Sequence, residues 1–276
     1  MSHPIFQTGR TAVVTGASSG IGLAACRRFA GFGMNVVMVD IETSALQSAQ
    51  ADIAAASTRG GDAVLAVPTD VADPNAIDAL KAAVDARYGP VALLMNNAAT
   101  RLSGTFWDDP TPWRQAMEVN FWGVVSGVRA FVPDMMATGA QSVVINTGSK
   151  QGITNPPGNT IYNVGKSAVK TYTEALQHEL RRTEGCRVTA HLLVPGWTTT
   201  GGRAHQPGAW LPDQVIDELL AGLERGSFYI VCPDDETSHE EDRRRILWAA
   251  HDITEDRPPL SRWHGGYDEE FARFEG

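Results

Sequence analysis

The sequence predicts an α/β fold, a doubly wound parallel sheet of about seven strands with helices on both faces. Short apolar runs rich in Val, Ile and Leu recur along the chain, and Ala-rich segments of helical length lie between them. The runs are apolar throughout rather than alternating, which is typical of parallel strands covered on both faces. Strand and helix signals that alternate about seven times favour a doubly wound sheet.

The strands and helices can be placed in chain order. The apolar runs predict strands within residues 11–16, 35–40, 62–70, 91–98, 142–149, 187–196 and 227–234. Amphipathic segments predict helices at Ile21–Phe32, Ser44–Ser57 and Pro74–Tyr88, and longer ones from about Pro110 to Thr138 and from about Thr160 to Arg182.

No linker rich in Pro, Gly or Ser divides the chain, so we interpret residues 1–276 as a single domain. Residues 233–276 form an extension that begins with the charged stretch DDETSHEEDRRR and continues with Trp and Pro. This extension is too apolar to be freely disordered and too short to be a domain. We expect it to pack on the body or on a neighbouring subunit, with residues 239–245 forming a solvated helix face.

Composition limits the class of partner. The net charge of −9 disfavours non-specific binding to nucleic acid or to an anionic membrane. We find no secretory signal and no apolar stretch near the roughly 18 residues that span a bilayer, so a cytoplasmic protein is expected. The three cysteines form no CxxC pattern, and His178 and His191 have no ligand spacing, so no metal site is expected.

A glycine-rich turn, TGASSGIG, lies between the first strand and the first helix. Gly16, Gly20 and Gly22 let the backbone approach a pyrophosphate closely, and the amides of the helix N-terminus face the anion. Ser18 and Ser19 add hydroxyl donors. A tight turn with a purely structural role remains the alternative, although the strand before it and the helix after it favour nucleotide binding.

Asp40 ends the second apolar run, 18 positions after Gly22. A carboxylate here can accept hydrogen bonds from both hydroxyls of an adenosine ribose, and its charge repels a 2′-phosphate. Ile41 and Glu42 supply no cation to neutralise that phosphate, so NAD is favoured over NADP. The alternative is an Asp that merely caps the next helix.

The glycine-rich turn, Asp40 and several further motifs follow one another along the chain. In their identity and order they make the chain resemble the short-chain dehydrogenase/reductase family from about Arg10 to Cys232. The motifs that carry the resemblance are Thr15–Gly22, Asp70, Asn96-Asn97-Ala98, Asn120, Ser149, Tyr162, Lys166 and Pro195-Gly196. The resemblance implies a Rossmann-type fold and an NAD(P)-dependent oxidoreductase that interconverts a secondary alcohol and a ketone. It also implies a homodimer or homotetramer, through an interface of the helices at 110–138 and 160–182.

The resemblance further implies a site, carried over to matching positions only. Catalysis would involve Asn120, Ser149, Tyr162 and Lys166. The cofactor would contact Gly16, Ser18, Ser19, Gly20, Ile21, Gly22, Asp40, Asp70, Val71, Asn97, Ala98, Ala99, Tyr162, Lys166, Pro195, Gly196, Thr198 and Thr200. Asp70 and Val71 match the pair that contacts adenine, and Thr198 and Thr200 match the segment that holds the nicotinamide amide. Ala99 departs from the family's glycine, which matters only if this residue needs positive φ.

Alcohol oxidation needs a base, and the Tyr162–Lys166 pair can supply one. Free tyrosine has a pKa near 10, too high for a base near neutral pH, and a nearby positive charge lowers it. Positions four apart share one helix face, so Lys166 can reach toward Tyr162. Ser149 can donate a hydrogen bond to the substrate oxygen. Taken singly, each could instead be an ordinary surface, strand-end or interior residue.

The substrate is a small-molecule alcohol or ketone that the sequence does not identify. We expect its pocket to be bounded by residues 100–102 and 151–155, with Gln151, Trp197 and Trp210 as candidate contacts. Residues 201–212, GGRAHQPGAWLP, predict a mobile lid. Two alternatives stay open: an NAD(H)-binding sensor of the same fold without turnover, and an NADP-dependent reductase.

Overall fold

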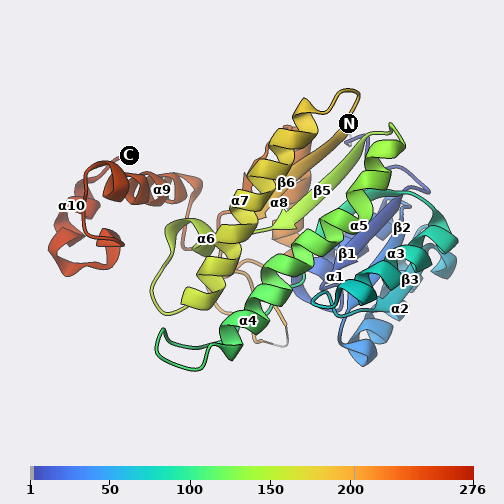
Figure 1. Cartoon of the computed structure of the whole chain (residues 1–276), viewed down its shortest axis with the longest axis horizontal. Helices are drawn as coiled ribbons and strands as arrows, with labels where there is room; N and C mark the ends of the chain where they lie inside the picture. Colours follow the sequence, from blue (N-terminus) through green and yellow to red (C-terminus); the bar gives the residue numbers. More distant parts are fainter. Residues whose placement is uncertain (1–2, 202) are drawn as a thin grey trace.

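A parallel sheet of seven strands forms the centre of the computed structural model, which describes residues 3–201 and 203–276 (Figure 1). The strand order is β3-β2-β1-β4-β5-β6-β7. The strands are β1 Thr11–Thr15, β2 Asn35–Asp40, β3 Val64–Pro68, β4 Val91–Asn96, β5 Ser142–Thr147, β6 Val188–Val194 and β7 Tyr229–Val231. Each predicted apolar run contains one of them, and the predicted Rossmann-type fold is confirmed.

Ten α-helices accompany the sheet in the described residues. They are α1 Gly20–Gly31, α2 Thr43–Ala56, α3 Pro74–Tyr88, α4 Thr111–Met117, α5 Gly123–Ala137, α6 Gln151–Thr154, α7 Thr160–Arg182, α8 Pro212–Glu224, α9 His239–Thr254 and α10 Asp268–Arg273. Single 3₁₀ turns lie at Gly61–Ala63, Ser261–Trp263 and Gly265–Tyr267.

The two faces of the sheet have separate apolar cores because successive strand residues point to opposite sides. Val14 of β1 packs with residues of α1, α2 and α8, such as Phe29 and Leu219. Its neighbour Val13 belongs to the other core, with residues of α3 and α5 such as Leu80 and Phe131. Helices therefore cover both faces, as the uninterrupted apolar strands predicted.

The predicted helix at 110–138 is interrupted by a π-helical turn that the sequence did not predict. α4 and α5 are joined through a π-helical turn at Glu118–Trp122, with the fully buried Asn120 at its centre. Such turns are rare and are often found at functional sites.

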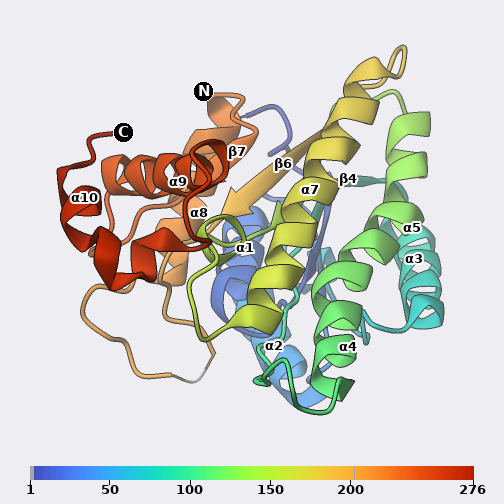
Figure 2. The same ribbon diagram turned by 60° about the vertical axis from the view of Figure 1, so that its left-hand side comes forward.

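The chain after β7 forms a small helical lobe, in which α9 packs against α6 and α10 lies at the end farther from α6 (Figures 1 and 2). Trp248 of α9 is 1% exposed and makes edge-on contacts with Phe271 and Phe274. Its indole N–H donates to the Ser261 hydroxyl over 2.7 Å. The extension thus has a core of its own. Across the described residues, the helices are too short or too polar to span a bilayer.

Candidate active site

A cavity of about 770 Å³ opens beyond the carboxyl ends of the strands, where the sheet order changes direction between β1 and β4. This is where doubly wound folds bind their ligands. Eighteen of the predicted site residues line it: Gly16, Ser18, Ser19, Gly20, Ile21, Asp40, Asp70, Val71, Asn97, Ala98, Ala99, Ser149, Tyr162, Lys166, Pro195, Gly196, Thr198 and Thr200. The lining does not include Gly22, Asn120, Gln151, Trp197 or Trp210.

The glycine-rich turn brings backbone against backbone. Gly16 and Gly20 have φ of 67° and 55°, a region that favours glycine. A Cβ on Gly22 would lie 2.1 Å from the Gly16 carbonyl oxygen, so Gly22 acts from behind the cavity wall. Ser19 precedes α1 without a side-chain cap, which leaves the first amides of this helix available to an anion.

Asp40 is oriented by its own neighbours. Its Oδ2 accepts hydrogen bonds from the backbone N–H and the hydroxyl of Ser18, at 3.0 and 2.7 Å, and Oδ1 accepts from the Glu42 N–H at 3.2 Å. A carboxylate accepts about four hydrogen bonds. Two ribose hydroxyls can therefore bind Asp40 together only if the Ser18 hydroxyl turns away.

Asn97 ties three strand ends together. Its side-chain N–H donates to the Thr15 carbonyl oxygen over 3.0 Å, and its Oδ1 accepts from the Thr147 hydroxyl at 3.3 Å. The Thr15 hydroxyl accepts in turn from the backbone N–H groups of Asn97 and Ala98. Ala99 is not among the residues with positive φ, so the alanine fits where the family has glycine.

Ser149, Tyr162 and Lys166 converge in the cavity. Tyr162 and Lys166 lie one turn apart on α7, and the Lys166 Nζ is 5.6 Å from the centroid of the Tyr162 ring. The buried Lys166 ammonium donates to the Thr147 carbonyl oxygen over 2.7 Å. This bond fixes the lysine between the end of β5 and the tyrosine.

The electrostatics of this group favour ionisation of Tyr162. Burial opposes the phenolate, but the charges of Lys166 and Arg101 and polar contacts with Arg101 and Ser149 outweigh it, so the pKa of Tyr162 lies below its ordinary value. Burial is also the main reason that the pKa of Lys166 is lowered. The phenolate of Tyr162 partly counteracts that effect.

Arg101 is a site residue that the sequence reasoning did not single out. It follows β4 in the loop over the cavity, and its guanidinium carbon lies 4.8 Å from the centroid of the Tyr162 ring. The sequence placed residues 100–102 at the substrate pocket but offered no signal that this side chain would meet the tyrosine.

Asn120 holds the backbone of the same loop by hydrogen bonds to Thr100. Its side chain accepts from the Thr100 N–H at 2.7 Å and donates to the Thr100 carbonyl oxygen over 2.9 Å. The π-helical turn therefore places a buried amide where it holds the backbone next to Arg101. In this geometry the side chain of Asn120 supports the site and does not face the cavity.

The three candidate substrate contacts lie outside the cavity lining. Trp197 is 45% exposed, and the Trp210 indole N–H donates to the Asp235 carboxylate over 3.1 Å. Backbone hydrogen bonds pair Trp210 with Trp197 and Thr199, which closes the base of the predicted lid. Gly201 and Arg203 of that segment line the cavity, whereas Gly202 lies outside the described residues.

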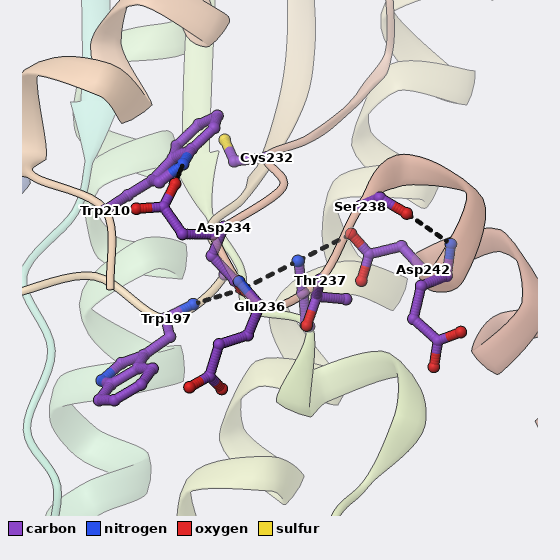
Figure 3. Close-up of polar contacts among 12 residues, drawn as sticks. Trp197, Trp210, Cys232, Asp234, Glu236, Thr237, Ser238 and Asp242 are labelled. Atoms are coloured by element: carbon purple, nitrogen blue, oxygen red, sulfur yellow. Dashed lines mark hydrogen bonds and ion pairs between the residues drawn. The ribbon is translucent and has the colours of Figure 1, made fainter. Parts of the chain in front are cut away.

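The start of the extension, with Asp234 and Asp242, lies near Trp197 of the loop after β6 (Figure 3). Asp234 Oδ2 accepts from the Trp197 N–H at 3.0 Å and pairs with the Lys150 ammonium at 3.1 Å. Asp242 of α9 pairs with the same ammonium at 2.7 Å. Lys150 follows Ser149 directly, so this cluster connects the extension to the serine and to the loop after β6.

The pKa values of the two carboxyls shift in opposite directions. Burial opposes the charge on Asp234, but the Trp197 N–H and Lys150 outweigh it, so its pKa is lowered. Burial dominates at Asp242, whose pKa is raised despite the Lys150 contact. Asp242 is 6% exposed, so the prediction that residues 239–245 form a solvated helix face is wrong at this position.

Comparison with known proteins decides the family. The model of the short chain dehydrogenase family matches residues 10–207. The chain belongs to the short-chain dehydrogenase/reductase family. It is accordingly an oxidoreductase with a nucleotide-binding Rossmann fold.

Individual members show how far the similarity reaches. This short-chain dehydrogenase is 33% identical to 1-deoxy-11-beta-hydroxypentalenate dehydrogenase of Streptomyces exfoliatus over 265 residues, which cover 92% of this chain and 94% of the relative. A short-chain dehydrogenase/reductase from Burkholderia phymatum, solved in complex with NAD, matches with a TM-score of 0.82 and 30% identity over 92% of this chain and 97% of its own.

A second solved structure differs in its cofactor. The short-chain dehydrogenase of Sphingobium yanoikuyae, in complex with NADPH, matches with a TM-score of 0.74 and 25% identity, covering 90% of this chain and 96% of its own. Members of similar fold thus bind NAD or NADPH. The choice made by this short-chain dehydrogenase depends on its own residues near the adenosine ribose.

Proposed function

We propose that the protein interconverts a secondary alcohol and a ketone by hydride transfer to a nicotinamide dinucleotide, with Tyr162 as the general acid/base. The observation that carries this proposal is the position of Tyr162 in the cavity, close to Lys166 and Ser149, with a lowered pKa. A base whose pKa is shifted toward the working pH is what proton abstraction from an alcohol needs.

The cavity residues fit the cofactor. The glycine-rich turn and the uncapped start of α1 suit a pyrophosphate, and Asp40 suits two ribose hydroxyls once the Ser18 hydroxyl turns away from it. No Arg or Lys lies in the segment Asp40–Glu42 to receive a 2′-phosphate, so we propose NAD as the preferred cofactor. When bound, the nicotinamide accepts a hydride from the alcohol carbon.

The protein's own groups handle the proton. The Tyr162 phenolate oxygen accepts the hydroxyl proton of the alcohol, while the Ser149 hydroxyl donates a hydrogen bond to the same substrate oxygen. Lys166 stabilises the phenolate by its charge, and Thr147 holds the ammonium in place. In the reverse direction Tyr162 returns the proton to the oxygen of the ketone.

The test is a panel of secondary alcohols assayed with NAD and with NADP at 340 nm, repeated with Tyr162→Phe. We expect turnover with NAD, a clear preference for NAD over NADP, and a loss of at least about 100-fold in kcat in the variant, the scale of general acid–base catalysis. NADH affinity should stay nearly unchanged because the phenol ring and its packing remain.

Different failures identify different errors. Substantial activity of Tyr162→Phe would mean that another group is the base. Preference for NADP would contradict the proposed role of Asp40. Tight NADH binding without oxidation of any alcohol in a broad panel would favour the sensor.

A further inference from the structure

The charged side chains of the cavity are separated by sign. Of the acidic ones, Asp40 ends β2, Glu42 follows it, and Asp70 follows β3. The basic ones are Arg101 after β4, Lys166 on α7 and Arg203 after β6. Since β2 and β3 lie on one side of β1 and β4 to β6 on the other, the two signs occupy opposite halves of the cavity.

The basic half is also the half of the proposed chemistry, because it contains Tyr162 and Ser149. Of the described residues that line it, none is acidic. Lys166 is buried and committed to the Thr147 carbonyl oxygen and to the tyrosine. The positive charge that remains accessible belongs to the arginines, and Arg101 is the one in contact with Tyr162.

Arg101 has no carboxylate partner in residues 3–201 and 203–276. No ion pair forms on its guanidinium, although the chain has 32 acidic residues and a net charge of −9. Its exposed side chain lines the cavity, and Asn120 fixes the backbone beside it through Thr100. The guanidinium therefore offers its donors to the cavity and to Tyr162.

We propose that Arg101 is an anion subsite and that the reacting alcohol carries a carboxylate a few bonds from its carbinol carbon. A guanidinium matches a carboxylate in shape and binds it through two parallel hydrogen bonds. The guanidinium carbon lies 4.8 Å from the centroid of the Tyr162 ring and the guanidinium is within hydrogen-bonding reach of the tyrosine, so an anion on Arg101 would lie near the oxygen that exchanges its proton with Tyr162. This inference rests on the proposed function and narrows its substrate to hydroxy and oxo acids.

The first experiment measures binding to the protein saturated with NADH, which blocks the pyrophosphate site against free anions. The probes are pentanoate and pentanamide, which have the same number of heavy atoms and differ in charge, titrated by saturation-transfer NMR at pH 7. We expect pentanoate to bind roughly 10- to 100-fold more tightly, the scale of one charge-assisted hydrogen-bonded pair.

Two variants and a control assign this preference to one side chain. Arg101→Gln should lower pentanoate affinity by about tenfold or more and leave pentanamide unchanged, and Arg101→Lys should restore part of the loss. Arg181→Gln, an exposed arginine near the end of α7 and outside the cavity lining, should leave both probes unchanged.

A kinetic comparison uses 4-hydroxypentanoate and 4-hydroxypentanamide with NAD at 340 nm. The acid should have the higher kcat/KM in the wild type, and the advantage should disappear in Arg101→Gln. Equal binding of the two probes, no binding of either, or an advantage that survives in Arg101→Gln would overturn the proposal. Tighter binding of butanesulfonate than of pentanoate would contradict the carboxylate.

The NADH titration keeps the two proposals apart. If NADH does not bind, the proposed function fails before the anion is tested, and the subsite fails with it. If NADH binds and alcohols without a carboxylate are oxidised as well as hydroxy acids, only the subsite is wrong.

Discussion

Tyr162 lies between two cations of different character. Lys166 is buried and held by the Thr147 carbonyl oxygen, whereas Arg101 is exposed and reaches over the ring from the loop after β4. The buried charge is screened less by solvent, so it should dominate the acidity of the phenol. Arg101 adds a smaller contribution that a bound carboxylate would neutralise.

A pH prediction follows for Lys166→Met, which keeps the length of the side chain and removes its charge. Tyr162 must lose its proton to act as a base, so alcohol oxidation falls as pH drops below the pKa of Tyr162. Lys166 holds that pKa below its ordinary value. Its removal raises the pKa, and the acid limb of the kcat/KM profile for oxidation should move to higher pH.

At a pH below the pKa of Tyr162, each unit of that displacement lowers the rate about tenfold, since the phenolate fraction falls by that factor. NADH affinity measured in parallel separates this effect from weaker cofactor binding. Lys166→Arg is the control, because it keeps the positive charge. An acid limb that stays at its wild-type pH in Lys166→Met would remove the lysine from this role.

Residue identities at the site were predictable where they belong to a spaced motif. Gly16 and Gly20 of the turn, Tyr162 and Lys166 line the cavity, whereas Gly22 packs behind its wall. Arg101 could not be predicted, because its contact with Tyr162 depends on how the loop after β4 folds over the cavity. The sequence also could not reveal that Asn120 points at Thr100, since that contact follows from the π-helical turn.

The strands and helices differ in how well they can be predicted from the sequence. The strands are uninterrupted apolar runs, and α3 begins with Asp73 accepting from the Asn75 N–H ahead of its first turn. The start of α9 looked solvated because it reads HEEDRRR, yet Asp242 turns inward to Lys150. A partner 92 positions earlier (242 − 150) leaves no periodic signal in the local sequence.

The connection between β7 and α9 leads to a prediction for Asp234→Asn. The amide can still accept from the Trp197 N–H, but Lys150 loses one of its two carboxylates. We expect the free energy of unfolding to fall by roughly 1–3 kcal/mol, the scale of a lost charged hydrogen bond. A Cβ on Gly196 would lie 2.3 Å from Asp234 Oδ2, so a shift of this carboxylate reaches the loop after β6 directly.

NADH affinity should therefore weaken several-fold at a temperature where the variant is fully folded. Asp256→Asn is the matched control, because it removes an exposed carboxylate of the same extension at a positive φ that asparagine tolerates. Wild-type NADH affinity in Asp234→Asn, with only the stability lowered, would confine Asp234 to a structural role.

At the scale of the whole molecule, the exposed apolar residues point to assembly. Trp122 in the π-helical turn and Val164 on α7 are 49% and 43% exposed. They belong to the two helical segments through which the family resemblance implies a homodimer or homotetramer. Ile253 in the extension is 84% exposed and marks the other surface from which a partner could be bound.

Light scattering after size exclusion distinguishes these surfaces. We expect the wild type to have two or four times the chain mass of 29.7 kDa and Trp122→Glu to have a lower mass, because a buried unpaired carboxylate opposes association. Ile253→Glu should leave the mass unchanged. A wild-type mass of one chain, or dissociation by Ile253→Glu alone, would contradict an interface formed by the long helices.

The charge cluster around Lys150 is also completed late in translation. Its two anionic partners, Asp234 and Asp242, are added 84 and 92 residues later (234 − 150 and 242 − 150). At the usual elongation rate of about 5–20 residues per second, that is a delay of roughly 4 to 18 s. During this interval the nascent sheet can form through β6, while the ammonium of Lys150 lacks both of its carboxylate partners. A ribosome that stops before residue 234 therefore releases a chain with every proposed catalytic residue but without the two carboxylates that pair with Lys150, one of which also accepts from the Trp197 N–H.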